Sequence, residues 1–225
     1  MKKILVSPFF VPTFFVIVWL SWVCVLFVFG YDNLPYILEE HGPLEIVTHW
    51  AYAPLLLTFL ATAYYFGKNN QKLDFALFVL LGITAFLREL GAQHWLASRD
   101  TTAFKSRFFL NPNNPLSEKI IAGAILIALV AIIIYLAKKY GKHLVVSFFK
   151  MNATTWSVAT LCAFGIFGKI IDRLPANYRK ANGVSLPEQM EINLKIIEET
   201  SETMLPLIAA VVLLQYVLIG KNKQN

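Results

Sequence analysis

The chain has 225 residues, of which 57% are hydrophobic and only 15% are charged. A soluble globular domain carries about 25% charged residues, so the composition excludes an ordinary soluble protein and indicates one that places apolar surface in lipid. The net charge of +6 does not indicate nucleic-acid binding, because the sequence has no zinc-finger, RNP or helix-turn-helix pattern. Cys24 and Cys162 lie in separate apolar runs without metal-ligand spacing.

Six stretches are long and apolar enough to cross a bilayer, because a transmembrane helix needs about 20 mostly apolar residues. They cover residues 9–30, 47–66, 73–95, 119–137, 153–171 and 197–219. No small-x-small cleavage site follows Lys2 and Lys3, so the first stretch is expected to remain as an uncleaved span. The sequence therefore predicts an all-α fold in which residues 1–225 form a single bundle of six transmembrane helices.

Lysines mark one set of loops and predict the orientation of the bundle. The short segments 1–8, 67–72, 138–150 and 220–225 are rich in lysine, whereas the connections 31–46, 96–118 and 172–196 carry mixed charge. Because basic loops stay in the cytoplasm, both termini are predicted to be cytoplasmic. Turns are predicted within the longer connections, at 111–115, Leu174-Pro175 and Asn182-Gly183.

All acidic residues except Asp74 fall on the opposite side, together with most of the histidines. Several lie in the end turns of predicted spans, where an ionised group is costly and usually faces the bundle interior or a water-filled cavity. Four predicted spans thus place acidic, basic and imidazole side chains at a similar depth in the membrane. This predicts an extracytoplasmic polar pocket. Its predicted members are Glu45, His49, Arg88, Glu89, His94, Lys169, Asp172, Arg173, Glu198 and Glu202.

Helical spacing predicts two sets of contacts inside this cluster. Glu45 and His49 are four residues apart at the start of the second span, so they share a helix face and are expected to pair. Lys169, Asp172 and Arg173 stand at positions i, i+3 and i+4 at the end of the fifth span. This arrangement favours an ion pair between Lys169 and Asp172.

Three further predictions join different spans. Glu198 and Glu202 open the sixth span and are stacked on one face of it. Arg88 lies about two turns inside the third span and is expected to pair with Glu202, because an unpaired buried charge is costly. His49 and His94 stand at the same side of neighbouring spans and are expected to lie close together.

Three interpretations of the cluster remain open. In the first, its ion pairs fix the register of the helices in a non-catalytic membrane subunit. In the second, Glu45, His49 and His94 bind a divalent metal, with zinc as the candidate, and the metal activates water to hydrolyse a lipid ester or amide. In the third, the carboxylates and a histidine carry protons or ions in a transporter or flippase.

The preferred interpretation is that the pocket handles a lipid or lipid-linked anionic substrate drawn from the surrounding membrane lipids, with no nucleic-acid partner. The choice between an enzyme and a transporter stays open. The predicted substrate-binding residues are Arg88, Lys169, Asp172, Arg173 and Glu198. The predicted catalytic residues, if the protein is an enzyme, are Glu89, His94 and Glu202.

Four segments resemble recurrent blocks of a group of small bacterial multi-pass inner-membrane proteins. They are Glu39-Glu40-His41-Gly42-Pro43-Leu44-Glu45, Leu87-Arg88-Glu89-Leu90 with His94, Lys105-Ser106-Arg107-Phe108-Phe109 and Glu198-Glu199-Thr200-Ser201-Glu202. The resemblance spans residues 39–202 and implies a helical membrane fold and a bacterial inner-membrane location. Glu45, His49 and His94 are also similar in kind to the zinc ligands of alkaline ceramidase-like membrane hydrolases. The later histidine-rich motif of that family is missing, since no histidine follows His143.

Overall fold

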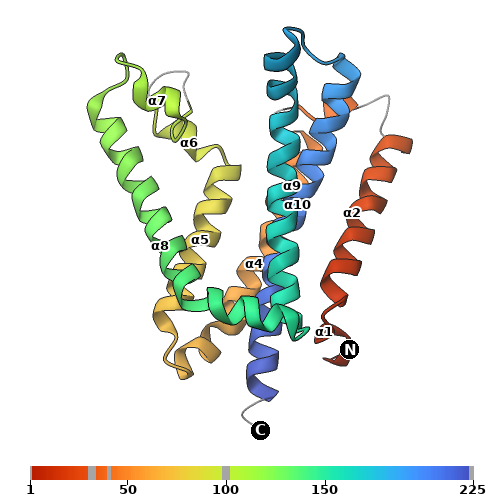
Figure 1. The fold of residues 1–225 in the computed structure, drawn as a ribbon, viewed down its shortest axis with the longest axis vertical. Coiled ribbons are helices and arrows are strands. Elements are labelled where there is room, and N and C mark those ends of the chain that lie inside the picture. Colours follow the sequence, from red (N-terminus) through yellow and green to blue (C-terminus); the bar gives the residue numbers. More distant parts are fainter. Residues whose placement is uncertain (1, 30–33, 40–41, 98–101, 223–225) are drawn as a thin grey trace. The chain divides into compact units, whose positions relative to one another are not determined.

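A computed structural model describes residues 2–29, 34–39, 42–97 and 102–222, and every regular element in these ranges is helical (Figure 1). This confirms the predicted all-α fold. The helices in chain order are α1 (Lys2–Leu5), α2 (Phe10–Phe29), α3 (Leu34–Ile37), α4 (Pro43–Lys68), α5 (Lys72–Glu89), α6 (Ala92–Trp95), α7 (Ser106–Leu110), α8 (Leu116–Phe149), α9 (Ala153–Asn182) and α10 (Glu188–Asn222).

Five of these helices are long and apolar enough to cross a membrane, namely α2, α4, α8, α9 and α10. By length and composition the chain is therefore a multi-pass membrane protein. The third predicted span, 73–95, is not one helix: α5 ends at Glu89, and Gly91 adopts a left-handed conformation with φ of 72° before α6 begins. The six-span count and the orientation stay predictions.

The last three long helices extend past the apolar stretches that predicted them. α9 has 30 residues, which makes it about 45 Å long, whereas the hydrocarbon core of a bilayer is about 30 Å thick. The predicted loop at 138–150 is almost entirely helical, because α8 continues to Phe149. The predicted turn at Leu174-Pro175 is wrong, since Pro175 lies inside α9. The predicted turn at Asn182-Gly183 is confirmed, with Gly183 in a left-handed conformation.

The chain divides into two compact units. Unit 1 comprises Met1–Tyr65 and Ser147–Asn225, and it contains α1 to α3, most of α4, the last residues of α8, α9 and α10. Unit 2 comprises Phe66–Val146, with α5 to α7 and most of α8. The single domain predicted for residues 1–225 stays a prediction.

α10 is the central helix of unit 1. Every residue from 196 to 220 is buried or half-buried, and the helix packs against both α2 and α9 (Figure 1). Buried apolar side chains of these three helices meet in one cluster, so helix packing in unit 1 excludes lipid from its centre. The cluster consists of Val11, Phe15, Phe164, Met204 and Ile208.

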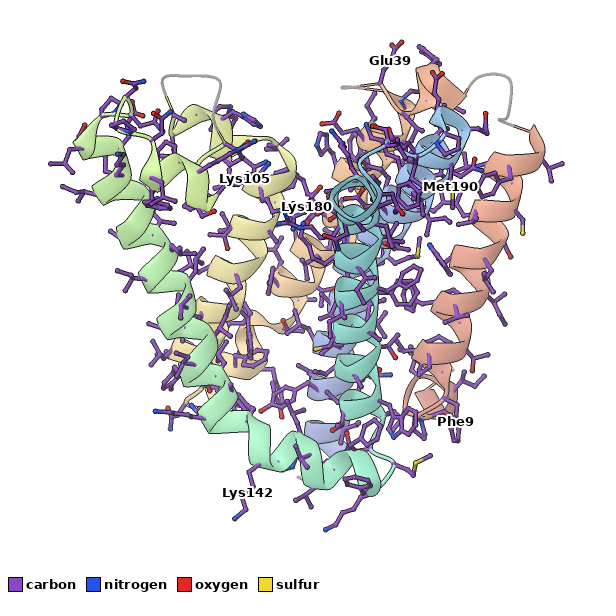
Figure 2. The ribbon with its side chains drawn as sticks, turned by 45° about the horizontal axis from the view of Figure 1, so that its top comes forward. Phe9, Glu39, Lys105, Lys142, Lys180 and Met190 are labelled. Carbon is purple, nitrogen blue, oxygen red and sulfur yellow. The ribbon has the colours of Figure 1, made fainter. Side chains whose placement is uncertain are left out.

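A buried glutamine joins three segments at one end of unit 1. Gln215 of α10 is fully buried; its Nε2 donates to the carbonyl oxygen of Leu5 at 2.7 Å, and its Oε1 accepts from the Ser157 hydroxyl of α9 at 2.6 Å. The rings of Phe9 and Trp156 lie 5.8 Å apart at the same end. The starts of α2 and α9 therefore lie beside the C-terminal part of α10, at the end of unit 1 where Figure 2 labels Phe9.

α4 runs alongside α10 in the same direction. The hydroxyl groups of Thr48 and Thr203 are 2.6 Å apart and both side chains are buried. Further along both helices, the ring centroids of Tyr65 and Tyr216 are 6.5 Å apart. Because early residues of α4 contact earlier residues of α10 and late residues contact later ones, the two helices are parallel. α4 thus ends at the end of unit 1 where α9 begins.

Unit 2 is built on an antiparallel pair of helices, α5 and α8. Asp74 in the first turn of α5 contacts Lys139 in the later part of α8. At the other end of the pair, Phe108 of α7 is fully buried against Ala103 and Ala122. α7 and the segment before it thus cover the start of α8.

Candidate functional site

One hydrogen bond fixes the depth of the acidic residues of α10. Trp19 Nε1 donates to the Thr200 hydroxyl at 3.1 Å, and Trp19 lies at the middle of the 20-residue α2. A helix of that length is about as long as the hydrocarbon core is thick. Glu198 and Glu202 flank Thr200, so they lie close to the level of Trp19, at the middle of α2. α10 itself begins ten residues before Glu198, at Glu188, so the two carboxylates lie inside a continuous helix, and the prediction that they open a membrane span stays a prediction.

α9 and α10 approach each other closely at Gly168. A Cβ atom at this position would lie only 2.8 Å from the Ser201 hydroxyl oxygen and 3.9 Å from Cγ of Glu202. Small residues at such crossings let membrane helices come together. Ser201 is fully buried and donates to the carbonyl oxygen of Glu198 at 2.7 Å. The missing side chain at Gly168 thus brings the acidic turn of α10 against α9.

Asp172 pairs with two basic side chains of α9, of which the sequence spacing predicted Lys169. Its carboxylate forms an ion pair with Lys169 and lies 3.8 Å from Nε of Arg173. The Lys169 and Arg173 side chains are 55% and 64% exposed, whereas that of Asp172 is 33% exposed. Both cations therefore keep more than half of their surface accessible while they are paired.

The basic and acidic groups occupy different sides of α9. Gly168 is buried where α9 meets α10. With 3.6 residues per turn, Arg173 points away from that face, whereas Asp172 stays close to it. The negative charge of Asp172 acts on the Glu198 carboxylate more strongly than that of Glu202 does. Cations therefore line the outer side of α9, and carboxylates gather where α9 meets α10.

α4 adds an acid and an imidazole to the same end of unit 1. Oε1 of Glu45 lies 3.7 Å from Nε2 of His49, which confirms that the two side chains meet one helical turn apart. Thr48, next to His49, contacts Thr203, next to Glu202. The Glu45–His49 pair therefore lies in the part of α4 that contacts the acidic turn of α10.

Three predicted site residues belong to unit 2. Arg88 lies in the last turn of α5, not two turns inside a span, and its guanidinium is 3.9 Å from the Glu89 carboxylate. His94 is exposed on α6, which the left-handed Gly91 separates from α5. The predictions that combine residues of both units stay predictions. They are the pairs Arg88–Glu202 and His49–His94, the catalytic group Glu89, His94 and Glu202, and the metal ligands Glu45, His49 and His94.

Within the described ranges, no group of three or more His, Cys, Asp and Glu side chains is arranged to hold a metal ion. Glu45 and His49 together offer two ligand atoms, whereas a catalytic zinc site usually has three protein ligands and one open position. The predicted zinc ion therefore depends on His94 of unit 2 and stays a prediction.

A buried charged cluster that the sequence did not predict lies in unit 2. Asp74 is fully buried, and both its carboxylate oxygens lie 2.7 Å from Nζ of Lys139. The hydroxyl groups of Tyr140 and Tyr135 donate to the same carboxylate at 2.5 and 3.4 Å. Two features of the sequence could have indicated this cluster. Asp74 is the one acidic residue on the lysine-rich side, and its three partners lie within two turns of α8: Tyr135, Lys139 and Tyr140.

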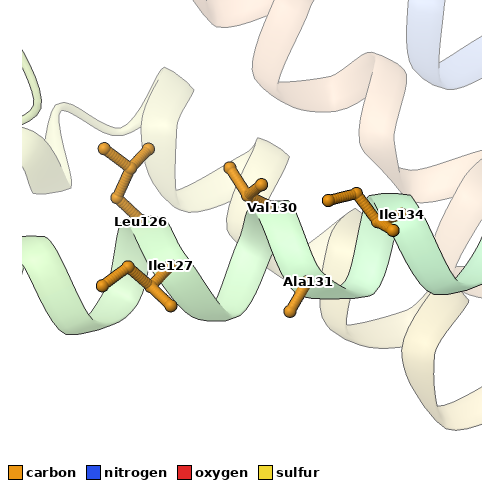
Figure 3. A pocket seen from close by; sticks show the side chains of 5 residues that line it. All are labelled: Leu126, Ile127, Val130, Ala131 and Ile134. Atoms are coloured by element: carbon orange, nitrogen blue, oxygen red, sulfur yellow. The ribbon is translucent and has the colours of Figure 1, made fainter.

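A hollow of about 380 Å³ lies along α8 (Figure 3). All five side chains that line it belong to this one helix, and none of them is polar: Leu126, Ile127, Val130, Ala131 and Ile134. Binding sites combine an apolar wall with a few polar groups. The hollow is therefore an apolar surface of the most apolar helix and offers no polar group for chemistry.

Comparisons of this chain with protein families, with characterised proteins and with solved structures find no match. The resemblances to small bacterial inner-membrane proteins and to ceramidase-like hydrolases therefore stay expectations from the sequence. The charged turns inside unit 1 carry the functional conclusion.

Proposed function

We propose that this multi-pass membrane protein handles a lipid or lipid-linked substrate with an anionic head group at the charged turns of α9 and α10. The observation that carries the proposal is the Trp19–Thr200 hydrogen bond, which aligns the acidic turn of α10 with the mid-length of α2. Ionisable side chains inside a membrane are costly and mark substrate or ion pathways. A purely structural role, in which ion pairs fix the register of the helices, does not explain why Lys169 and Arg173 are more than half exposed.

The two sides of α9 offer complementary chemistry. On the outer side, Lys169 and Arg173 donate hydrogen bonds to a phosphate or carboxylate head group, which competes with Asp172 for them. On the inner side, Glu198 and Glu202 are proton acceptors. In an enzyme, Glu202 takes the proton of the attacking water, and Lys169, paired with Asp172 beside the acidic turn, stabilises the negative charge that develops on the substrate, while Arg173 holds the head group.

A proton-coupled transporter or flippase is the second candidate, and the excess of carboxylates over cations favours it. The Glu198 carboxylate is repelled by three nearby carboxylates, those of Asp172, Glu199 and Glu202. It is attracted by the amine of Lys169. Chains of intramembrane carboxylates serve as proton relays in pumps and transporters. In this version the head group still binds Lys169 and Arg173, and proton transfer through the acidic turn drives its movement.

We further propose that the chain crosses the membrane six times, with α5 as the additional crossing. α4 ends, and α9 begins, at the end of unit 1 that contains Gln215 and Tyr216. Residues 66–146 connect these two points, so this segment begins and ends on the same side of the membrane. It therefore crosses the membrane an even number of times. α8 is the most apolar helix, and its antiparallel partner α5 supplies the return crossing.

The head-group proposal is tested with purified protein in detergent micelles. Added phosphatidylglycerol should raise the unfolding temperature more than phosphatidylcholine does. The double substitution Lys169→Gln with Arg173→Gln should abolish this difference. Lys180→Gln, which removes an exposed charge farther along α9, should preserve it. Equal stabilisation of the unaltered protein by both lipids would refute the proposal.

The enzyme and the transporter differ in what Glu202→Gln removes. In both cases the substituted protein should still be stabilised by phosphatidylglycerol. In an enzyme it should lose hydrolysis of lipid in mixed micelles, and in a transporter it should lose lipid-dependent proton flux across vesicles. Elemental analysis of the purified protein for zinc, with His49→Ala and His94→Ala as comparisons, tests the metal-assisted version separately.

A further inference from the structure

The outer face of α9 carries an apolar stripe that leads to the two exposed cations. Cys162, Ile166 and Ile170 follow one another at intervals of four residues, so they lie in one row along the helix. All three are exposed, with Ile166 at 61% and Ile170 at 56%. Gly168, on the side that meets α10, is buried. The stripe therefore faces away from the packed core of unit 1.

The stripe runs along α9 toward the level of the lipid phosphates. Trp19, at the middle of α2, contacts both Phe164 and Phe167 of α9, with ring centroids 5.8 and 5.4 Å apart. Arg173 is six to nine residues further along α9, or about 9–13 Å at 1.5 Å per residue. Half the thickness of the hydrocarbon core is about 15 Å. The backbone of Arg173 therefore lies about 2–6 Å short of the boundary between acyl chains and head groups, which its side chain can span, and Lys169 extends its side chain toward the boundary from one turn deeper.

The outer face of α9 carries basic residues, whereas the opposite face of α9 contacts the acidic turn of α10. Lys169 and Arg173 continue the outer face on which the stripe lies, while Gly168 adjoins Ser201 and Glu202 on the other side. A phosphate that approaches along the stripe meets the cations before the carboxylates. α2, which also exposes a cysteine to its surroundings at Cys24, has no basic residue between Phe10 and Phe29.

We propose that one chain of an anionic phospholipid lies along Cys162, Ile166 and Ile170, with its phosphate held by Lys169 and Arg173. This inference rests on the proposed function and narrows the substrate to a lipid that stays in the bilayer and reaches the site sideways. A water-soluble phosphate ester has no chain to cover the stripe. The two cations select a lipid with an anionic head group, and the apolar stripe holds its acyl chain beside α9.

The test uses Cys162 as a fluorescent reporter. In a Cys24→Ser variant, Cys162 is labelled with a bimane probe, and the protein is placed in phosphatidylcholine vesicles. Equal fractions of either phosphatidylglycerol or phosphatidylcholine with brominated acyl chains are then added as quenchers. Brominated phosphatidylglycerol should occupy the stripe about fivefold more than phosphatidylcholine, the ratio that corresponds to about 1 kcal/mol for one basic residue near an anionic lipid.

The matched control carries the probe on α2. With Cys162→Ser and the probe at Cys24, both brominated lipids should quench equally. Lys169→Gln with Arg173→Gln should bring the ratio at Cys162 to one, and Lys180→Gln should leave it unchanged. Equal quenching at Cys162 in the parent protein would overturn the inference. If the head-group-dependent stabilisation survives in that case, the proposed function stands and only the chain position is wrong; if it is also lost, both fail.

Discussion

Lys139 contacts both carboxylate oxygens of Asp74 at 2.7 Å and so joins the first turn of α5 to the later part of α8. The two partners differ in their surroundings, because the Asp74 side chain is 1% exposed and that of Lys139 is 44% exposed. A half-exposed lysine can extend its amine to water when its partner is lost. A buried carboxylate has no such alternative, and an uncompensated buried charge strongly destabilises a protein.

The Asp74–Lys139 pair should therefore respond asymmetrically to substitution. Lys139→Gln should lower the unfolding temperature in detergent more than Asp74→Asn does, because only the first leaves a buried charge without its cation. The double substitution should recover part of the loss caused by Lys139→Gln. Lys138→Gln, which removes an exposed neighbouring charge, serves as the control. Equal losses from the two single substitutions would show that burial of Asp74 does not govern the pair.

Gly168 should tolerate no side chain while Ser201 keeps its hydroxyl. Gly168→Ala should cost about 1–3 kcal/mol of stability, the usual effect of overpacking a close contact, because the new Cβ would lie 2.8 Å from the Ser201 hydroxyl oxygen. Gly165→Ala is the matched control one turn earlier, where the nearest atom is Cδ2 of Leu205 at 4.0 Å. Chemical unfolding measures both variants.

A second substitution identifies the cause of that loss. Ser201→Ala removes the hydroxyl oxygen that the new Cβ meets, so Gly168→Ala combined with Ser201→Ala should be more stable than Gly168→Ala alone. If Gly165→Ala and Gly168→Ala destabilise equally, close approach of α9 and α10 at Gly168 is not the reason.

Gln215 should stabilise the N-terminal segment against α10. Gln215→Leu removes hydrogen bonds to the Leu5 carbonyl and the Ser157 hydroxyl. It should cost about 1–3 kcal/mol, because buried polar groups lose their partners. Proteolysis before α2 should become faster in the same variant. Ser157→Ala keeps the bond between Gln215 and Leu5 and should leave proteolysis at the N-terminal segment unchanged, which separates this contact from general loss of stability.

The six-crossing topology predicts which single cysteines react from which side of the membrane. In a Cys24→Ser, Cys162→Ser background, Asn70→Cys and Lys142→Cys should be labelled by an impermeant maleimide from one side. Lys105→Cys and Lys180→Cys should be labelled from the other side. Reaction of residues 70 and 105 from the same side would show that α5 does not cross. Reaction of 70 and 180 from the same side would exclude six crossings.

Near-neighbour contacts along a helix were predictable from the sequence, because the 3.6-residue repeat determines which side chains meet. The Glu45–His49 and Lys169–Asp172 contacts are of this kind. Helix ends were less predictable, since apolarity marks where lipid contact stops and not where a helix stops. α9 is instead bounded by local signals: the side chain of Asn152 accepts a hydrogen bond from the Thr155 amide, and Gly183 adopts a left-handed conformation.

The sequence by itself determined that this protein is helical and lies in a membrane, because apolar stretches of about 20 residues have no other stable solvent. Only the tertiary structure decided which polar residues meet across helices. Asp74 contacts Lys139 across 65 positions of the chain, and Trp19 contacts Thr200 across 181. Such contacts depend on the sliding and rotation of whole helices against one another, which small residues such as Gly168 permit. Periodicity within a single helix carries no information on that offset, so the depth of Glu198 and Glu202 came from packing alone.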